Sequence, residues 1–152
     1  MSARGWSVNI GLMTVQSHSL RRSHGELLKA AQQLAVAGRE VRRAPIYGRE
    51  AQLATVLLVL RDSVLPHIER DERVLYPELE KQLGASASAA HLEDDHVAIR
   101  DWIGRLTATK VEDDAELERL LYGLSALINV HVWKEERLYA GVLEALPWSS
   151  DD

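Results

Sequence analysis

The sequence of 152 residues contains no cysteine and no phenylalanine, and tyrosine and tryptophan are few. Without cysteine the chain can form no disulfide, thiolate metal site or iron–sulfur cluster, so any metal must bind through imidazole and carboxylate groups. The glycine-rich phosphate loops and the G-x-S-x-G nucleophile motif are also absent. These absences exclude several common classes of nucleotide-binding protein and hydrolase.

The charge and hydropathy of the chain limit its partners. The formal net charge of -5 argues against binding to nucleic acid or to an anionic membrane. We expect no apolar run long enough to span a bilayer, and the beginning, "MSARGWSVNIGLM", is not typical of a signal peptide. Residues 1–152 are therefore expected to form a single domain in a cytoplasmic protein.

Apolar residues follow helical spacing along most of the chain, and no segment alternates with the period of a strand. The predicted helices span approximately 14–37, 49–82, 86 or 88 to 107, and 113 or 114 to 146. The first should stop at Gly38, and Pro66 should kink the second just before His67. Short connections favour antiparallel neighbours, so we predict an all-α, up-down-up-down four-helix bundle with its core at about 14–146.

Positions spaced alternately by three and four residues form the core stripe of each predicted helix. In the second helix this stripe contains Leu53, Leu57, Leu60, Val64, His67, Asp71 and Val74. In the fourth it contains Leu117, Leu121, Leu124, Ile128, His131, Glu135 and Leu138. The first and third stripes each contain one histidine, His24 and His96. Every helix thus turns one histidine inward, and two helices add a carboxylate four residues later.

This set of residues predicts a metal centre. A single inward histidine is more often a hydrogen-bonded core residue than a ligand, but two buried carboxylates without a basic partner on the stripes would cost many kcal/mol. Metal cations remove that cost. Four imidazoles and two carboxylates are too many for one tetrahedral zinc. They suit two iron ions joined by the carboxylates and an oxide or hydroxide bridge, with manganese or zinc as substitutes.

The chain resembles the hemerythrin-like, or HHE cation-binding, family over about residues 17–146. The resemblance rests on "RRSHGELLKAAQQLA", "LPHIERDERVLYPEL", "EDDHVAIRDWIGRL" and "HVWKEERLYAGVLE". It implies a four-helix bundle with a non-haem di-iron centre. It also implies that His24 and His67 bind one iron, that His96 and His131 bind the other, and that Asp71 and Glu135 bridge them.

The sequence departs from the family pattern at two positions. Asp71 stands where glutamate is usual, so either the kink at Pro66 brings the shorter side chain closer or Glu72 takes its place. Leu92 stands where oxygen-carrying hemerythrins have a fifth histidine, which leaves room that the phenol of Tyr47 could fill if its loop folded into the core. His18 and His91 lie beside the stripes and are expected on the surface, and Tyr76 and Tyr139 are expected to pack beside the bundle. Trp102 and Trp133 are expected either around the centre or in a dimer face.

A four-histidine centre favours sensing or reaction over reversible oxygen carriage, because both irons stay more open. The predicted core stripes contain no lysine, no serine and no third carboxylate that could act as a general acid on an organic substrate. We therefore expect a small diatomic or peroxide ligand. Three hypotheses remain open: a di-iron protein that binds O2, NO or a redox signal; a catalase- or peroxidase-like enzyme; and iron storage or a structural metal site. The sequence identifies no redox partner.

Overall fold

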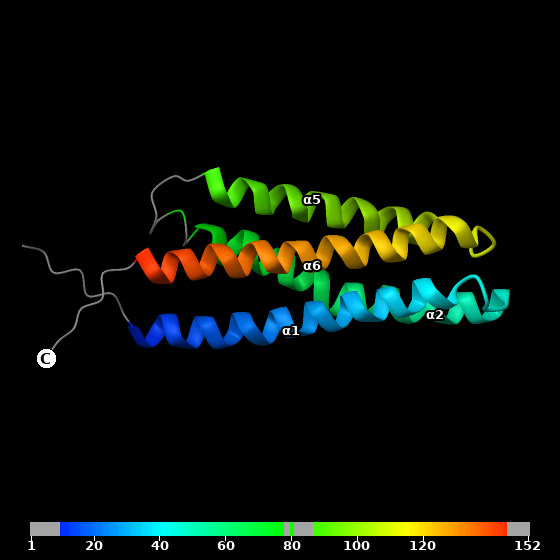
Figure 1. The fold of residues 1–152 in the computed structure, drawn as a ribbon, viewed down its shortest axis with the longest axis horizontal. Helices are drawn as coiled ribbons and strands as arrows, with labels where there is room; N and C mark the ends of the chain where they lie inside the picture. Colours follow the sequence, from blue (N-terminus) through cyan, green and yellow to red (C-terminus); the bar gives the residue numbers. More distant parts are fainter. Residues whose placement is uncertain (1–9, 78–79, 81–86, 146–152) are drawn as a thin grey trace, which may run out of the picture.

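A computed structural model of the chain describes residues 10–77, 80 and 87–145, with side chains described within 21–77, 80 and 90–138. The described residues form an all-α bundle of four long helices without a strand (Figure 1). The helical segments are α1 (Ile10–Glu40), α2 (Ile46–Val59), η1 (Leu60–Val64), α3 (Leu65–Arg70), η2 (Asp71–Leu75), α5 (Ala87–Ala108) and α6 (Asp114–Ala145). The segments from α2 to η2 form one continuous helix, so the predicted fold class is confirmed.

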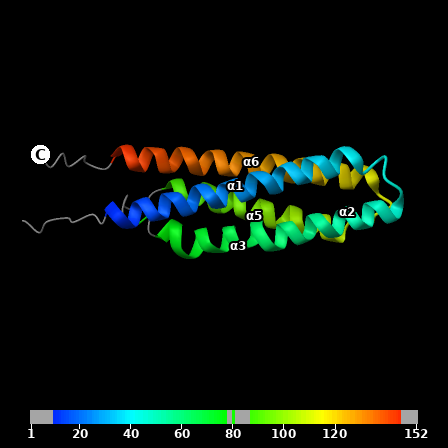
Figure 2. The same cartoon turned by 90° about the horizontal axis from the view of Figure 1, so that it is seen from below.

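The helices run up, down, up and down, with both ends of the described chain at the same end of the bundle (Figures 1 and 2). Helix α6 packs against both α1 and α5, and α1 also packs against α2 and η1. The first connection is shorter than expected, because α1 continues to Glu40 and α2 begins at Ile46 with Pro45 at its N-cap. Predicted features near residues 82, 86 and 147 lie outside the described residues, as do the side chains of His18 and Tyr139.

Two glycines, Gly38 in α1 and Gly123 in α6, allow α6 to pack closely against its neighbouring helices. The prediction that the first helix stops at Gly38 was wrong, because Gly38 lies inside α1. A Cβ atom there would lie 3.3 Å from the Tyr122 ring of α6, so this glycine serves the α1–α6 contact rather than a helix end. Gly123 makes room for Trp102 of α5, whose ring would lie 1.9 Å from an added Cβ. Trp102 therefore packs between α5 and α6.

The second helix departs from regular α geometry at two π-helical turns. In η1 the Leu65 N–H bonds to the Leu60 carbonyl, and in η2 the Tyr76 N–H bonds to the Asp71 carbonyl. The first π turn ends just before Pro66, which has no N–H for a regular helical bond. A π turn contains an extra residue and so changes which side chains face the core.

Most of the predicted core-stripe residues are buried, but the second helix departs from its predicted stripe at several positions. Leu60 and Val64 are almost fully buried, Leu53 and Leu57 are only partly buried, and Val74 is 55% exposed. Since η2 shifts the register after Asp71, Tyr76 takes the inward position instead and is 1% exposed. The predictions that Val74 faces the core and that Tyr76 packs beside the bundle were therefore wrong, and the π turn is the reason.

The helix Ile46–Leu75 is also long and apolar enough to cross a membrane by length and composition alone, with a mean hydropathy of 1.2. The expectation that no segment meets this test was wrong. The core helix of a bundle can meet it equally well, and this helix turns His67 and Asp71 toward the other helices.

Candidate metal centre

Six polar side chains meet in the middle of the bundle, where water and most hydrogen-bond partners are excluded. Each is at most 2% exposed: His24 on α1, His67 on α3, Asp71 on η2, His96 on α5, and His131 and Glu135 on α6. These are the residues that the core stripes predicted as ligands. Core aliphatic residues such as Ile68 and Ile128 pack in the bundle interior around this polar cluster.

Glu135 is close to three of the four imidazoles. Its Oε2 atom lies 3.0 Å from Nε2 of His24 and 3.5 Å from Nε2 of His67. The same oxygen lies 3.6 Å from Nε2 of His131, one turn earlier on α6. One carboxylate oxygen thus lies close to imidazoles from three helices.

Asp71 faces His67 one turn earlier on the same helix. Its Oδ2 atom lies 2.7 Å from Nε2 of His67, yet neither of these two atoms has a hydrogen-bond partner among the described residues, and neither does Asp71 Oδ1. Arg70 is no substitute, because its Nε atom lies 3.9 Å away and its side chain is 43% exposed. Buried polar atoms without partners are costly, and a shared cation would satisfy them.

His96 and His131 point their Nε2 atoms at each other from neighbouring helices, 3.1 Å apart. Adjacent ligands on one ion with bonds of ~2.1 Å lie about 3 Å apart, so this pair fits a common metal. Ligand atoms of His67, Asp71, His131 and Glu135 also lie within 4.8 Å of one another. The two motifs with a histidine and an acid four residues later therefore face each other across the core.

The outer nitrogen of every imidazole faces a polar group from another helix. Nδ1 of His67 lies 2.7 Å from Ser23 Oγ, and Nδ1 of His96 lies 3.1 Å from Glu72 Oε1. The remaining two pairs are longer: Nδ1 of His24 lies 3.4 Å from Glu136 Oε1, and Nδ1 of His131 lies 3.6 Å from Asp95 Oδ2. All four imidazoles thus direct Nε2 inward and Nδ1 outward.

Three of these outer partners are themselves held by a basic side chain. Arg100 donates two hydrogen bonds of 2.7 Å to the Glu72 carboxylate, and Lys134 donates bonds of 2.7 and 2.9 Å to Asp95. Arg70 donates to Ser23 Oγ at 2.6 Å, and this oxygen can also accept from an imidazole N–H. The carboxylates that face His96 and His131 favour a hydrogen on Nδ1 of these imidazoles, which leaves the Nε2 lone pair free for a metal. At His67, Nδ1 faces both Ser23 Oγ and an Arg70 nitrogen at 3.1 Å.

Burial and charge perturb the ionisation of the centre in opposite directions. Burial lowers the pKa of His131 to about 4 and also lowers the pKa of His96. Burial likewise opposes the charged form of His67, but the nearby carboxylates of Asp71 and Glu135 outweigh it and raise the pKa of His67 to about 9. Burial acts to raise the pKa of Glu135, yet hydrogen bonds with His24 and His67 hold it well below the ordinary range. The carboxylate is therefore ionised in the core.

Tyr76 lies within the cluster, although the sequence analysis placed it beside the bundle. Its hydroxyl group donates to Glu135 Oε1 at 2.7 Å and lies 3.1 Å from Nε2 of His96, while its ring stacks on that imidazole. The distance of five residues between Asp71 and Tyr76 was the only available signal, because it matches a π turn and not an α-helical repeat. Ser23 and Asp95 were also missed; each immediately precedes a histidine of the centre.

Two other candidate residues, Glu72 and Tyr47, lie outside the buried cluster. Asp71 is fully buried in the core, whereas Glu72 accepts hydrogen bonds from Arg100 and faces the outer nitrogen of His96. Tyr47 is 76% exposed in the first turn of α2 and does not belong to the cluster, contrary to the idea that its loop folds inward. His91 is exposed, as expected.

Comparison with known proteins gives one family. The sequence profile described as Hemerythrin HHE cation binding domain matches residues 15–143. Neither a comparison with curated proteins nor one with solved structures found a significant match.

Proposed function

Because this chain belongs to the hemerythrin HHE cation-binding family, we propose that its bundle holds two iron ions and that these bind or react with a small oxidant such as O2, NO or peroxide. His24, His67, His96 and His131 would supply the imidazole ligands, and Asp71 and Glu135 the bridging carboxylates. Family membership and a buried cluster of possible ligands support cation binding. The identity of the metal, the number of ions and the oxidant are our proposal.

One observation carries the proposal. Four imidazoles from four helices direct Nε2 into the core and Nδ1 toward outer partners. The Nε2 atoms of three of them approach Glu135, and that of His96 lies 3.1 Å from Nε2 of His131. A core that only satisfied its own hydrogen bonds would pair the inner atoms, yet both oxygens of Asp71 are without hydrogen-bond partners. The donor set contains nitrogen and oxygen but no sulfur, which suits iron or manganese.

Bound iron would supply Lewis acidity and electrons to a small ligand. The chain's own residues would exclude water with the surrounding aliphatic side chains and fix the imidazoles through their outer partners. The Tyr76 hydroxyl group would orient the Glu135 carboxylate through the hydrogen bond to Oε1. The centre is almost completely buried, and this favours a ligand of two to four atoms over an organic substrate.

The test begins with metal analysis of the purified chain, followed by reconstitution with ferrous iron without oxygen. About two irons per chain and a reversible spectral change on exposure to O2 or NO support the binding function. Sustained O2 evolution from added peroxide supports a catalase-like enzyme instead, and no response to any of the three supports storage or a structural site. One zinc per chain without iron uptake would refute the di-iron proposal.

The partners and the location of the protein follow from the same proposal. We propose a diatomic or peroxide ligand, no nucleic acid and no membrane as partners, and a cytoplasmic location. The net charge of -5 supports the absence of nucleic acid. Fractionation of cells that produce the full chain would test the location.

A further inference from the structure

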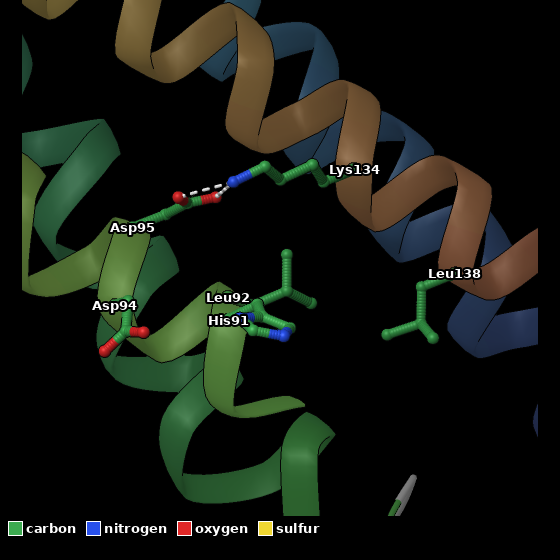
Figure 3. A pocket seen from close by; sticks show the side chains of 6 residues that line it. All are labelled: His91, Leu92, Asp94, Asp95, Lys134 and Leu138. Atoms are coloured by element: carbon green, nitrogen blue, oxygen red, sulfur yellow. Dashed lines mark hydrogen bonds and ion pairs between the residues drawn. The ribbon is translucent and has the colours of Figure 1, made fainter. Parts of the chain in front are cut away.

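A pocket of about 470 Å³ opens between α5 and α6 (Figure 3). Its lining residues are His91, Leu92, Asp94, Asp95, Lys134 and Leu138. Leu92 and Leu138 project from the two helices into the space between them, while Asp95 and Lys134 pair at one side. The pocket therefore has an apolar floor and a charged rim.

The two leucines that line the pocket also pack against a residue of the candidate metal centre. Leu92 is 3% exposed and forms a small apolar cluster with Tyr76, against which Leu138 packs. On the inner side, the Tyr76 hydroxyl group contacts Glu135 and lies 3.1 Å from Nε2 of His96. Leu92 and Leu138 thus line the pocket on one side and pack against Tyr76 on the other. Tyr76 in turn contacts the proposed ligands His96 and Glu135.

The rim of the pocket contacts the centre as well. Asp95 accepts two hydrogen bonds from Lys134, and its Oδ2 atom lies 3.6 Å from Nδ1 of His131. Because this ion pair ties α5 to α6 beside the pocket, the opening can persist without separating the helices. The pocket is thus connected to the centre at two points, through the leucines and through His131.

We propose that this pocket is the route by which a small uncharged ligand reaches the metal centre, with Leu92 and Leu138 as the barrier. The inference rests on the proposed function. A charged ligand would have to lose its water shell to pass two leucines, which is costly. The carboxylate of Asp94 also disfavours anions at the opening, whereas the charge of Asp95 is balanced by Lys134. O2, NO and H2O2 meet these conditions, whereas superoxide and nitrite do not.

The experiment uses the full chain loaded with ferrous iron, with NO as the probe. Stopped-flow absorbance would give the association rate for wild type, for Leu138→Ala, which widens the barrier, and for Leu138→Trp, which fills it. Leu58→Ala is the matched control, since Leu58 is a half-exposed leucine on α2 that does not line the pocket. Rates are compared at equal iron content per chain, and iron removal by a chelator is followed as a second measurement.

We expect NO association several-fold faster in Leu138→Ala, several-fold slower in Leu138→Trp, and unchanged in Leu58→Ala. Iron removal should be faster in Leu138→Ala than in the control. If Leu138→Trp fails to hold iron, the comparison of Leu138→Ala with Leu58→Ala tests the access route. NO binding to wild type with equal rates in Leu138→Ala and the control would overturn the access route and leave the proposed function intact. A wild-type chain that takes up no metal would overturn both.

Discussion

Replacing Asp71 by asparagine should remove most of the stability that the chain gains from metal. Asp71 is fully buried and lies 2.7 Å from Nε2 of His67, but neither of its oxygens has a hydrogen-bond partner among the described residues, so a metal cation would compensate its charge. Metal at ~1,000 times its Kd stabilises a protein by about 4 kcal/mol. In a domain of this size ~1 kcal/mol corresponds to ~2–4 °C, so wild type should gain ~8–16 °C in Tm.

Asparagine keeps the shape of the side chain but removes its charge. Loss of a residue that only supports a metal ligand weakens affinity ~10–100-fold, so loss of a ligand should cost at least ~100-fold. At the same metal concentration, the stabilisation of Asp71→Asn by metal would fall to about 1.4 kcal/mol, which corresponds to a rise of ~3–6 °C in Tm.

Calorimetry with and without ferrous iron or manganese measures this gain within each variant, so differences between the metal-free proteins cancel. Glu69→Gln is the control, because Glu69 is an exposed acid two residues earlier in the same helix and should retain the full gain. A metal-induced rise in Asp71→Asn equal to that of wild type would refute the assignment of Asp71 as a ligand.

Three further predictions concern the centre and the bundle. His67→Ala should lower bound metal from about two ions per chain toward one, whereas His91→Ala should leave it unchanged; equal metal content in both variants would show that the ligand assignment is wrong. Gly123→Ala should destabilise the fold by ~1–3 kcal/mol in urea unfolding, since its Cβ would overlap a tryptophan ring. Gly104→Ala, with no atom within 4 Å of the new Cβ, should instead stabilise by up to ~1 kcal/mol. In the metal-free protein, burial lowers the pKa of His131 from 6.5 to about 4. Between pH 4 and 6.5 this imidazole therefore binds more protons in the unfolded chain than in the folded one. The free energy of unfolding should decrease as the pH falls from 6.5 to 4. This part of the pH dependence should disappear in His131→Gln.

The fold and the inner residues of the centre were predictable because both depend on local spacing. A histidine and an acid four residues apart must share a helix face, and that face is identified by the leucines around it. His131 and Glu135 satisfy this rule in a regular helix, so their burial followed directly from the pattern.

The features that the sequence did not predict depend on an irregular backbone or on contacts between segments that are distant in the sequence. Tyr76 reaches the centre only because a π turn adds a residue after Asp71, and regular periodicity cannot reveal such a turn. The pairing of Arg100 with Glu72 joins two helices across 28 positions of sequence. Gly38 resembled a helix end, although its role is to admit the ring of Tyr122.

The two π turns set a condition for anyone who would transplant this centre into a designed scaffold. In an ideal α-helix each residue advances by about 100°, so copying the residues of η2 onto regular geometry would rotate Tyr76 away from Glu135 and bring Val74 inward. The grafted second helix would need its irregular turns, or one residue fewer between Asp71 and the tyrosine. A designer who copied only the six candidate ligands onto straight helices would thus reproduce the proposed metal donors but not the phenol beside them.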